Sequence, residues 1–348
     1  MKTHLVSLIS DNLIPNYLII KEFEGQYDDN IFITTKKMKE KGGGINLESA
    51  LGLQPNSVMR IYANEESWSQ TLQTLNNSQL NQDDRYIVNY TGGTKPMSIA
   101  VSIFFSKING SRFIYSPIGT NTYRENGIAE AQDIKTRITL ENYFLLYGIT
   151  IKSKTPAIDH KPKQLYRFFD LFHRNDRSLL GTIESARQNP DKHPIEERTF
   201  LCGGWFEEYI YARIKEEFNL SDDEVARSVQ VYKKGSNISN NDNEIDVAFV
   251  YENKLYIIEC KSSISGPILS NGGRIDQKEF ITSKLYKLAA ISTNFGLVVN
   301  SYLFVAKNIT VHNYSREMLE HRKRLLKIKQ ILDGNKFASR NTLKSMMM

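Results

Sequence analysis

The chain has 348 residues, of which 40% are hydrophobic and 24% are charged, a composition typical of globular proteins. This length is enough for two domains that each bury a hydrophobic core. The formal net charge of +6 permits an anionic partner but does not identify one. No apolar run reaches the roughly 18 residues that a transmembrane helix needs. The two cysteines, Cys202 and Cys260, are too few for a disulfide framework and form no zinc pattern, so we expect a reducing, cytoplasmic location.

The first 145 residues alternate short apolar strands with helices. The predicted strands are 5–9, 30–35, 58–62, 86–90, 112–116 and 131–134, and the predicted helices are 15–21, 66–75 and 98–107. Such alternation is typical of a mostly parallel sheet with helices on both faces. Residues 39–44 are polar and end in three glycines, so they are predicted to form a flexible loop.

Two polar turns follow strands of this predicted sheet. Residues Ser10, Asp11 and Asn12 follow the first strand, and Thr91, Gly92, Gly93, Thr94 and Lys95 lie between strand 86–90 and the next helix. Ligands of parallel sheets bind at carboxyl strand ends, and glycines and a helix N-terminus favour a phosphate or another anion there. The turn is not a Walker A loop, because the required glycine–lysine spacing is absent. A plain strand–turn–helix connection is equally compatible with it.

The middle of the chain carries weaker signals. Residues 140–151 are predicted to form a strand, residues 156–163 a linker with two prolines, and residues 164–173 and 179–186 two helices of a small insert. His160, His173 and His193 lack regular metal-binding spacing, so we expect them to face solvent or to form hydrogen bonds.

The most informative stretch is a predicted hairpin of strands 243–250 and 255–261, joined by a turn at Glu252 and Asn253. Asp246 lies early in the first strand, while Glu259 and Lys261 share one face of the second strand because their spacing is two. The hairpin can bring Asp246 beside Glu259, and two adjacent carboxylates favour a hard cation such as Mg²⁺ or Mn²⁺. The lysine could stabilise phosphorane charge or position an attacking water. An ordinary charged surface hairpin is the alternative.

A helix precedes the hairpin, opening at residues 202–211 and running to about residue 218, with Glu207 and Glu208 near its start. Helix, strand with Asp, and strand with Glu-x-Lys together resemble the core of the PD-(D/E)xK nucleases. The resemblance places the helix carboxylate at Glu207 or Glu208. Periodicity does not separate the two, because both helix faces are plausible, and we favour Glu207. The usual Pro-Asp of that family is replaced here by Ile245-Asp246.

The segment after the hairpin adds basic residues. A Ser/Gly-rich loop at 262–273, with a mobile segment at 266–273, precedes a helix at 276–292 and a strand at 297–305. That helix carries Lys278, Lys284 and Lys287; Lys284 could reach a substrate phosphate, although an ordinary exposed lysine is the simpler interpretation. A predicted helix at 315–333 carries Arg316, His321, Arg322, Lys323, Arg324, Lys327 and Lys329. It is either a solvated face or a surface for a nucleic-acid backbone.

Taken as a whole, the chain resembles the CARF-domain nucleases of type III CRISPR systems, the Can2/Card1 group. The resemblance rests on the first strand ending in Ser-Asp-Asn, on Tyr-Thr-Gly-Gly-Thr-Lys-Pro-Met at 90–97, and on the nuclease-like module. It implies an α/β chain with a Rossmann-like CARF domain at 1–145, a linker or helical insert at 146–198, and a restriction-endonuclease-like domain at 199–348.

The resemblance also implies partners. The CARF domain would dimerise and bind a cyclic oligoadenylate, with cyclic tetra-adenylate the expected ring, in a pocket shared across the two-fold axis. The implied ligand contacts are Ser10, Asp11, Asn12, Thr91, Gly92, Gly93, Thr94 and Lys95, with Thr34, Thr35 and residues 42–44 as weaker candidates.

For the nuclease domain, the resemblance implies that Glu207, Asp246 and Glu259 hold one or two Mg²⁺ or Mn²⁺ ions. The carbonyl of Cys260 would complete the coordination and Lys261 would align the attacking water. The expected substrate is single-stranded RNA or DNA, with nicking of duplex DNA. Two alternatives remain open, a constitutive restriction-type DNA endonuclease and a non-catalytic sensor or regulator that binds cyclic nucleotides.

Overall fold

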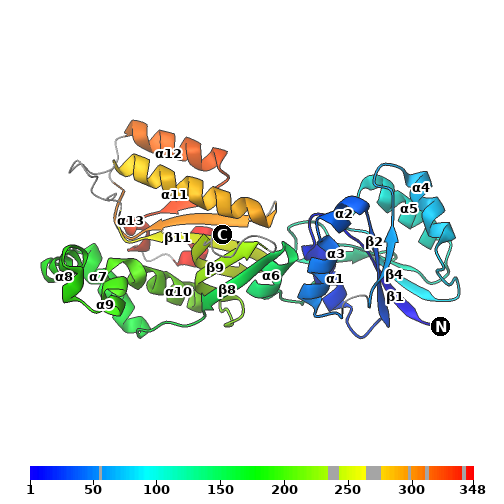
Figure 1. The fold of residues 1–348 in the computed structure, drawn as a ribbon, viewed down its shortest axis with the longest axis horizontal. Coiled ribbons are helices and arrows are strands. Elements are labelled where there is room, and N and C mark those ends of the chain that lie inside the picture. Colours follow the sequence, from blue (N-terminus) through cyan, green and yellow to red (C-terminus); the bar gives the residue numbers. More distant parts are fainter. Residues whose placement is uncertain (55–56, 234–242, 264–275, 297–298, 310–312, 339–341) are drawn as a thin grey trace. The chain divides into compact units, whose positions relative to one another are not determined.

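The computed structural model describes residues 1–54, 57–233, 243–263, 276–296, 299–309, 313–338 and 342–348 (Figure 1). The chain divides into two compact units, Met1–Thr150 and Ile151–Met348. Among the described residues, no helix has both the length and the apolar character that crossing a membrane requires. The Ser/Gly-rich segment at 264–275, with the segment at 266–273 that we expected to be mobile, lies outside the described residues.

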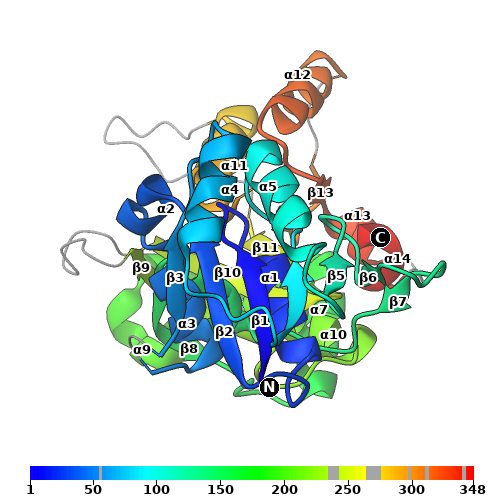
Figure 2. The same ribbon diagram turned by 90° about the vertical axis from the view of Figure 1, so that its right-hand side faces the viewer.

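The first unit contains a seven-stranded sheet of order β3-β2-β1-β4-β5-β6-β7. Its strands are β1 (Thr3–Leu8), β2 (Asp29–Thr34), β3 (Met59–Tyr62), β4 (Arg85–Asn89), β5 (Arg112–Tyr115), β6 (Thr122–Glu125) and β7 (Gln132–Asp133). Strands β1 to β5 pair in parallel, whereas β6 and β7 are antiparallel additions. Figure 2 shows β3, β2 and β1 side by side. Strand order reverses between β1 and β4, which makes their carboxyl ends the topological switch point.

Helices cover both faces of this sheet (Figure 1). They are α1 (Ile14–Glu22), α2 (Lys36–Glu40), α3 (Gly43–Leu51), α4 (Trp68–Asn77) and α5 (Lys95–Phe105), and a further helix, α6 (Leu140–Leu146), packs on α3. On β1, Val6 and Leu8 pack with Leu75 of α4 and Met97 of α5 in one buried cluster. Successive strand residues alternate between faces, so Leu5 and Ser7 point to the other face, where α1 lies.

Two expectations for the first unit were wrong. Residues 39–44 are not one flexible loop, because α2 ends at Glu40 and α3 begins at Gly43, with only Gly42 in the left-handed region at φ 76°. Thr35 caps α2 by accepting a hydrogen bond from the Met38 amide at 3.1 Å. Residues 140–151 are not one strand: Thr139 caps the helix α6, and β8 (Ile149–Thr155) follows. In both places a threonine N-cap begins a helix where the residue composition had indicated a loop or a strand.

The second unit is built on a six-stranded sheet of order β13-β12-β11-β10-β9-β8. Its remaining strands are β9 (Val225–Lys233), β10 (Asn243–Tyr251), β11 (Lys254–Lys261), β12 (Val299–Val305) and β13 (Gln330–Leu332). The predicted hairpin is confirmed as antiparallel β10 and β11, with Val247 opposite Ile258. Glu252 and Asn253 in its turn have φ values of 49° and 57°, as a tight type I′ turn requires.

The helical elements of the second unit are α7 (Pro162–His173), α8 (Arg177–Gln188), η1 (Pro190–Lys192), α9 (Ile195–Thr199), the π-helical turn η2 (Phe200–Gly204), α10 (Trp205–Glu217), α11 (Gln277–Ser292), η4 (Thr293–Phe295), α12 (Asn313–Leu325), α13 (Gly334–Phe337) and α14 (Leu343–Met347). Helix α10 is almost wholly buried, and Trp205 and Phe206 pack in one core with Phe249 and Ile258 of the sheet. This packing fixes the start of α10 against the hairpin.

The expected single helix at 315–333 was also wrong. Helix α12 ends at Leu325, Lys327 adopts a left-handed φ of 56°, and residues 330–332 form β13 beside β12. The basic residues therefore do not form one helical face, because Lys327 and Lys329 lie beyond the helix.

Candidate functional sites

The hairpin places Asp246 and Glu259 on adjacent strands. Extending the pairing of Val247 with Ile258 by one residue puts Asp246 opposite Glu259. Val247 and Ile258 belong to the core under α10, so Asp246 and Glu259 point to the opposite face of the sheet. Asp246 is 6% exposed and Glu259 is 2% exposed, and Asp246 Oδ2 accepts a hydrogen bond from the Cys260 amide at 2.7 Å. The expected pairing of the two carboxylates is confirmed.

Two lysine ammonium groups compensate these buried carboxylates. Lys261 Nζ lies 3.0 Å from Asp246 Oδ2 and 2.8 Å from Glu259 Oε1, so it bridges the pair. Lys287 Nζ, from α11, lies 3.0 Å from Glu259 Oε2. Buried charges of like sign are costly unless they are paired, and here each carboxylate contacts at least one cation.

The electrostatics of the cluster follow from burial. Desolvation raises the pKa of Asp246, an effect that Lys261 opposes and Glu259 reinforces. Burial alone would lower the pKa of Lys261, but the attraction of Asp246 and Glu259 raises it above its ordinary value. The Lys261 ammonium is therefore held charged between two carboxylates, and it cannot serve as a neutral base there.

The two helix carboxylates have different surroundings. Glu208 is 3% exposed, and its Oε2 accepts hydrogen bonds of 3.2 Å from the Asp159 and His160 amides. Glu207 is half-buried, and its pKa is raised to about 8 by desolvation and by the charge of Asp246, while Lys261 lowers it. Glu207 is thus electrostatically part of the hairpin cluster, whereas Glu208 is held by the segment before α7. This difference supports the choice of Glu207.

The donor set fits a hard divalent cation. Asp246, Glu259 and Glu207 offer carboxylate oxygens and Cys260 offers a backbone carbonyl, the oxygen ligands that Mg²⁺ and Mn²⁺ prefer. Within the described part of the chain, no three His, Cys, Asp or Glu side chains converge on a ready-made metal position. Lys261 Nζ lies where the two hairpin carboxylates meet, and it also donates to the Cys260 carbonyl at 2.7 Å.

Lys287 is the residue that the sequence did not single out. Lys284 and Lys287 both flank the buried stripe of α11, so helical spacing alone could not rank them. The structure places Lys287 on Glu259, whereas the Lys284 ammonium lies over the Phe280 ring at 5.2 Å from its centroid.

In the first unit, the two polar turns meet at the switch point. A Cβ atom on Gly92 would lie 2.2 Å from the Leu8 carbonyl oxygen and 3.1 Å from Ser10 Oγ, so only glycine fits. Gly93 adopts a φ of 75°, a left-handed conformation that also favours glycine. The residues after β1 and β4 are therefore in direct contact, as their neighbouring parallel strands require.

The helix that follows this turn is suited to an anion. Thr94 caps α5 by accepting a hydrogen bond from the Met97 amide at 3.5 Å, and Lys95 is exposed at the first helical position. The positive end of the helix dipole repels a cation at this position, and a bound anion would offset that repulsion. Asp11 lies at the same edge, where its carboxylate pairs with Lys41 at 2.6 Å. Asn12 Oδ1 accepts a hydrogen bond from the Ile14 amide at 3.3 Å.

A cavity of about 730 Å³ lies behind Glu208 in the second unit. Its lining includes His160, Phe200 and Arg227, and the His160 ring stacks on Phe200 with centroids 3.9 Å apart. Arg227 pairs with Asp159 at 2.5 Å and donates from Nε to the Ala157 carbonyl at 2.9 Å. These contacts join His160 and Arg227 to Phe200, Asp159 and Ala157 rather than to Asp246 or Glu259. His160 forms hydrogen bonds, as the sequence predicted.

The fold and the two sites define a class of protein in which an N-terminal Rossmann-like CARF domain precedes a C-terminal restriction-endonuclease-like domain. The chain belongs to the Card1 family: residues 4–143 match the Card1 CARF domain, and residues 195–338 match the Card1-like endonuclease domain. The family resemblance and the fold class predicted from the sequence are confirmed.

Solved structures agree with this fold. Can2 from Sulfobacillus thermosulfidooxidans, in complex with cyclic tetra-adenylate, aligns with a TM-score of 0.70 at 19% identity over 95% of each chain. Protein VC1899 from Vibrio cholerae aligns with a TM-score of 0.70 at 16% identity, covering 96% of this chain and 94% of that one. A type III CRISPR defence DNA nuclease activated by cyclic oligoadenylate aligns with a TM-score of 0.59 at 14% identity, covering 88% of this chain and 45% of that one. No curated protein matches the sequence.

Proposed function

We propose that the protein is a nuclease of type III CRISPR antiviral defence, activated by a cyclic oligoadenylate, with cyclic tetra-adenylate as the expected ring. Its substrates are single-stranded RNA or DNA, together with duplex DNA that it nicks. Membership of the Card1 family in both halves of the chain supports the pairing of a ligand-binding domain with an endonuclease domain. The observation that carries the catalytic part is the buried Asp246–Glu259 pair bridged by Lys261.

In the nuclease domain, Glu207, Asp246 and Glu259 would hold Mg²⁺ or Mn²⁺ with the Cys260 carbonyl. When bound, the cation supplies an activated water and charge stabilisation at the scissile phosphate. Asp246 is fixed for this role by the Cys260 amide, and Glu259 is fixed by its place on β11. Lys261 keeps its positive charge beside both carboxylates, so it neutralises the charge that develops on the phosphate and orients the attacking water.

In the CARF domain, the ring phosphates would lie on the glycine turn. Gly92 and Gly93 leave backbone N–H groups accessible, while Lys95 and the N-terminus of α5 supply positive potential. Ser10, Asn12, Thr91 and Thr94 add hydroxyl and amide groups at the same edge, and Asp11 positions Lys41. A two-fold symmetric ring would be shared between two copies of the chain, and its binding would favour a cutting arrangement of the nuclease domains.

A cleavage assay tests this function. Labelled single-stranded RNA, single-stranded DNA and supercoiled plasmid are incubated in Mn²⁺ with and without cyclic tetra-adenylate, with Glu259→Ala as the control. We expect cutting that depends on the ring and disappears in Glu259→Ala. Equal cutting without the ring would instead indicate a constitutive nuclease. Ring binding without any cutting would indicate a non-catalytic sensor.

A further inference from the structure

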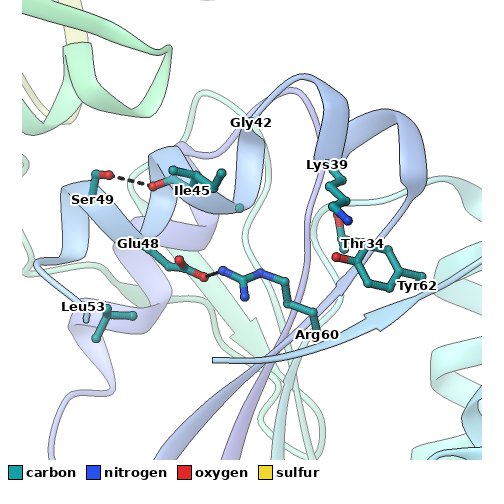
Figure 3. A pocket seen from close by; sticks show the side chains of 10 residues that line it. Thr34, Lys39, Gly42, Ile45, Glu48, Ser49, Leu53, Arg60 and Tyr62 are labelled. Carbon is teal, nitrogen blue, oxygen red and sulfur yellow. Dashed lines mark hydrogen bonds and ion pairs between the residues drawn. The ribbon is translucent and has the colours of Figure 1, made fainter. Parts of the chain in front are cut away.

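A second cavity lies in the first unit, at the same edge of the sheet as the glycine turn but with none of the turn's residues in its lining. It has a volume of about 430 Å³, within the range of about 300–1,000 Å³ that is common for small-ligand pockets. Thr34 and Tyr62, at the carboxyl ends of β2 and β3, form one side of it, and Ile45, Ser49 and Leu53 on and after α3 form the other (Figure 3).

The floor of the cavity is an ion pair. Arg60 of β3 donates from Nη2 to Glu48 Oε1, and Glu48 is 5% exposed although it lines the cavity. A guanidinium has five N–H donors, so Arg60 can contact a ligand while it holds Glu48. The cavity therefore presents a carboxylate acceptor and guanidinium donors next to each other (Figure 3).

The mouth of the cavity is apolar and uncovered. Ile45 is 51% exposed and Tyr62 is 39% exposed, which leaves two large side chains available to a flat ligand. The Lys39 ammonium lies 5.4 Å from the centre of the Tyr62 ring and adds positive charge at the rim. Apolar walls with a few convergent polar groups are typical of a site for a heteroaromatic ring.

The position of the cavity relates it to the glycine turn. The strands lie in the order β3-β2-β1-β4, so at ordinary strand spacing the end of β2, where Thr34 lines the cavity, is about 10 Å from the end of β4, where the glycine turn begins. Lys41, between α2 and α3, reaches Asp11 in the turn after β1 and so bridges the two sites. This separation suits one nucleotide whose phosphate lies on the glycine turn and whose base enters the cavity.

We propose that the cavity takes an adenine base of the bound cyclic oligoadenylate, with Glu48 accepting from the exocyclic amino group and Arg60 donating to a ring nitrogen. This proposal rests on the proposed ligand of the first unit. It makes the pair of Glu48 and Arg60 a determinant of base identity, while the glycine turn recognises phosphate without regard to the base.

Filling the cavity tests the site without removing a native contact. Gly44 lines the cavity in the first turn of α3, and a Cβ atom there would meet only Arg60 Nε, at an ordinary 3.8 Å. Gly44→Leu is therefore compatible with the helix and projects into the cavity. The matched control is Gly181→Leu on α8, where a Cβ atom would have nothing within 4 Å. We expect full-length Gly44→Leu to bind cyclic tetra-adenylate about tenfold or more weakly, with unchanged thermal unfolding, and the control to bind like the wild type.

A second experiment tests the chemistry. Titration calorimetry compares cyclic tetra-adenylate with the same ring built from purine riboside, which lacks the amino group. The wild type is expected to prefer the adenine ring by about tenfold, and Glu48→Met, which removes both acceptor oxygens at similar side-chain length, is expected to lose most of that preference. Unchanged affinity in Gly44→Leu, or equal binding of both rings by the wild type, would overturn the proposal and leave the proposed function standing. Failure of the wild type to bind either ring would overturn both.

Discussion

The two candidate sites consist of different kinds of chemical group. The hairpin site consists of buried ionisable side chains that the register of the sheet brings together. The Asp246 and Glu259 carboxylates each form an ion pair with at least one lysine. The turn site consists of backbone and small polar groups at the exposed ends of β1 and β4. Substitutions at the hairpin should therefore change chemistry and pH dependence. Substitutions at the turn should act through backbone geometry and leave the chemistry intact.

The largest effect is expected from the hairpin carboxylates. Asp246→Asn and Glu259→Gln keep shape but remove a negative charge, and each should lower the cleavage rate by about 100-fold or more. Glu208→Gln is the matched control, because Glu208 binds the 159–160 backbone rather than the hairpin cluster. Single-turnover cleavage with saturating ring measures the effect. Glu207→Gln should also lower the rate, and a low rate in Glu208→Gln beside a wild-type rate in Glu207→Gln would show that the wrong helix carboxylate was chosen.

At the turn, Gly92→Ala should weaken ring binding by about tenfold or more. The new Cβ atom would lie 2.2 Å from the Leu8 carbonyl oxygen, so the turn must move away from the end of β1. Fluorescence titration of a labelled ring measures affinity, and Gly181→Ala serves as the control because its Cβ has open space. Wild-type affinity in a folded Gly92→Ala protein would remove the turn from the ligand site.

The raised pKa of Glu207 predicts a pH-dependent gain in stability for Glu207→Gln. The folded-state pKa is about 8 against an ordinary 4.5, so the stabilising protonation is complete below pH 4.5 and is lost as the pH rises through about 8. In chelator, we expect Glu207→Gln to unfold like the wild type at low pH. Above pH 8 it should be more stable by on the order of 1–2 kcal/mol, a figure already reduced for partial exposure. Urea unfolding across this pH range measures the difference, and a constant difference would contradict the electrostatic account.

The smallest effect should come from Lys287. Lys287→Met removes one of the two cations on buried Glu259, and we expect a loss of about 1 kcal/mol in unfolding free energy, modest because Lys287 is partly exposed. Lys284→Met, on the same helix but over the Phe280 ring, should stay within about 0.5 kcal/mol of the wild type. Chemical denaturation without metal separates the two. Equal losses would mean that Lys287 is an ordinary surface lysine.

The sequence predicted the hairpin site better than its surroundings. Strand alternation and a turn dipeptide were enough to place Asp246 beside Glu259, because antiparallel register follows from local sequence. Choosing between Glu207 and Glu208 required the contacts of residues 159–160, which lie far away in sequence. The role of Lys287 could not be predicted for the same reason, because its partner Glu259 lies on another element.

In the first unit, the alternation of strands with helices and the glycine turn were predictable, but the cavity was not. Its floor joins Glu48 to Arg60 across a helix and a strand, and the glycine-rich stretch that we expected to be a loop is the start of α3. Gly43 and Gly44 lower the helix propensity of α3, yet its packing against α6, α1 and α2 overrides this cost. Residue composition could therefore indicate a ligand site at this edge of the sheet, but it could not reveal the cavity over Glu48 and Arg60.

The central claim is that ring binding in the first unit controls cutting in the second. The most direct test is a titration of cleavage rate against cyclic tetra-adenylate concentration in wild type and Gly92→Ala. Our account predicts a midpoint shifted to higher ring concentration in Gly92→Ala, with the same maximal rate and negligible cutting without ring. A lower maximal rate with an unshifted midpoint, or full cutting without ring in either protein, would contradict it.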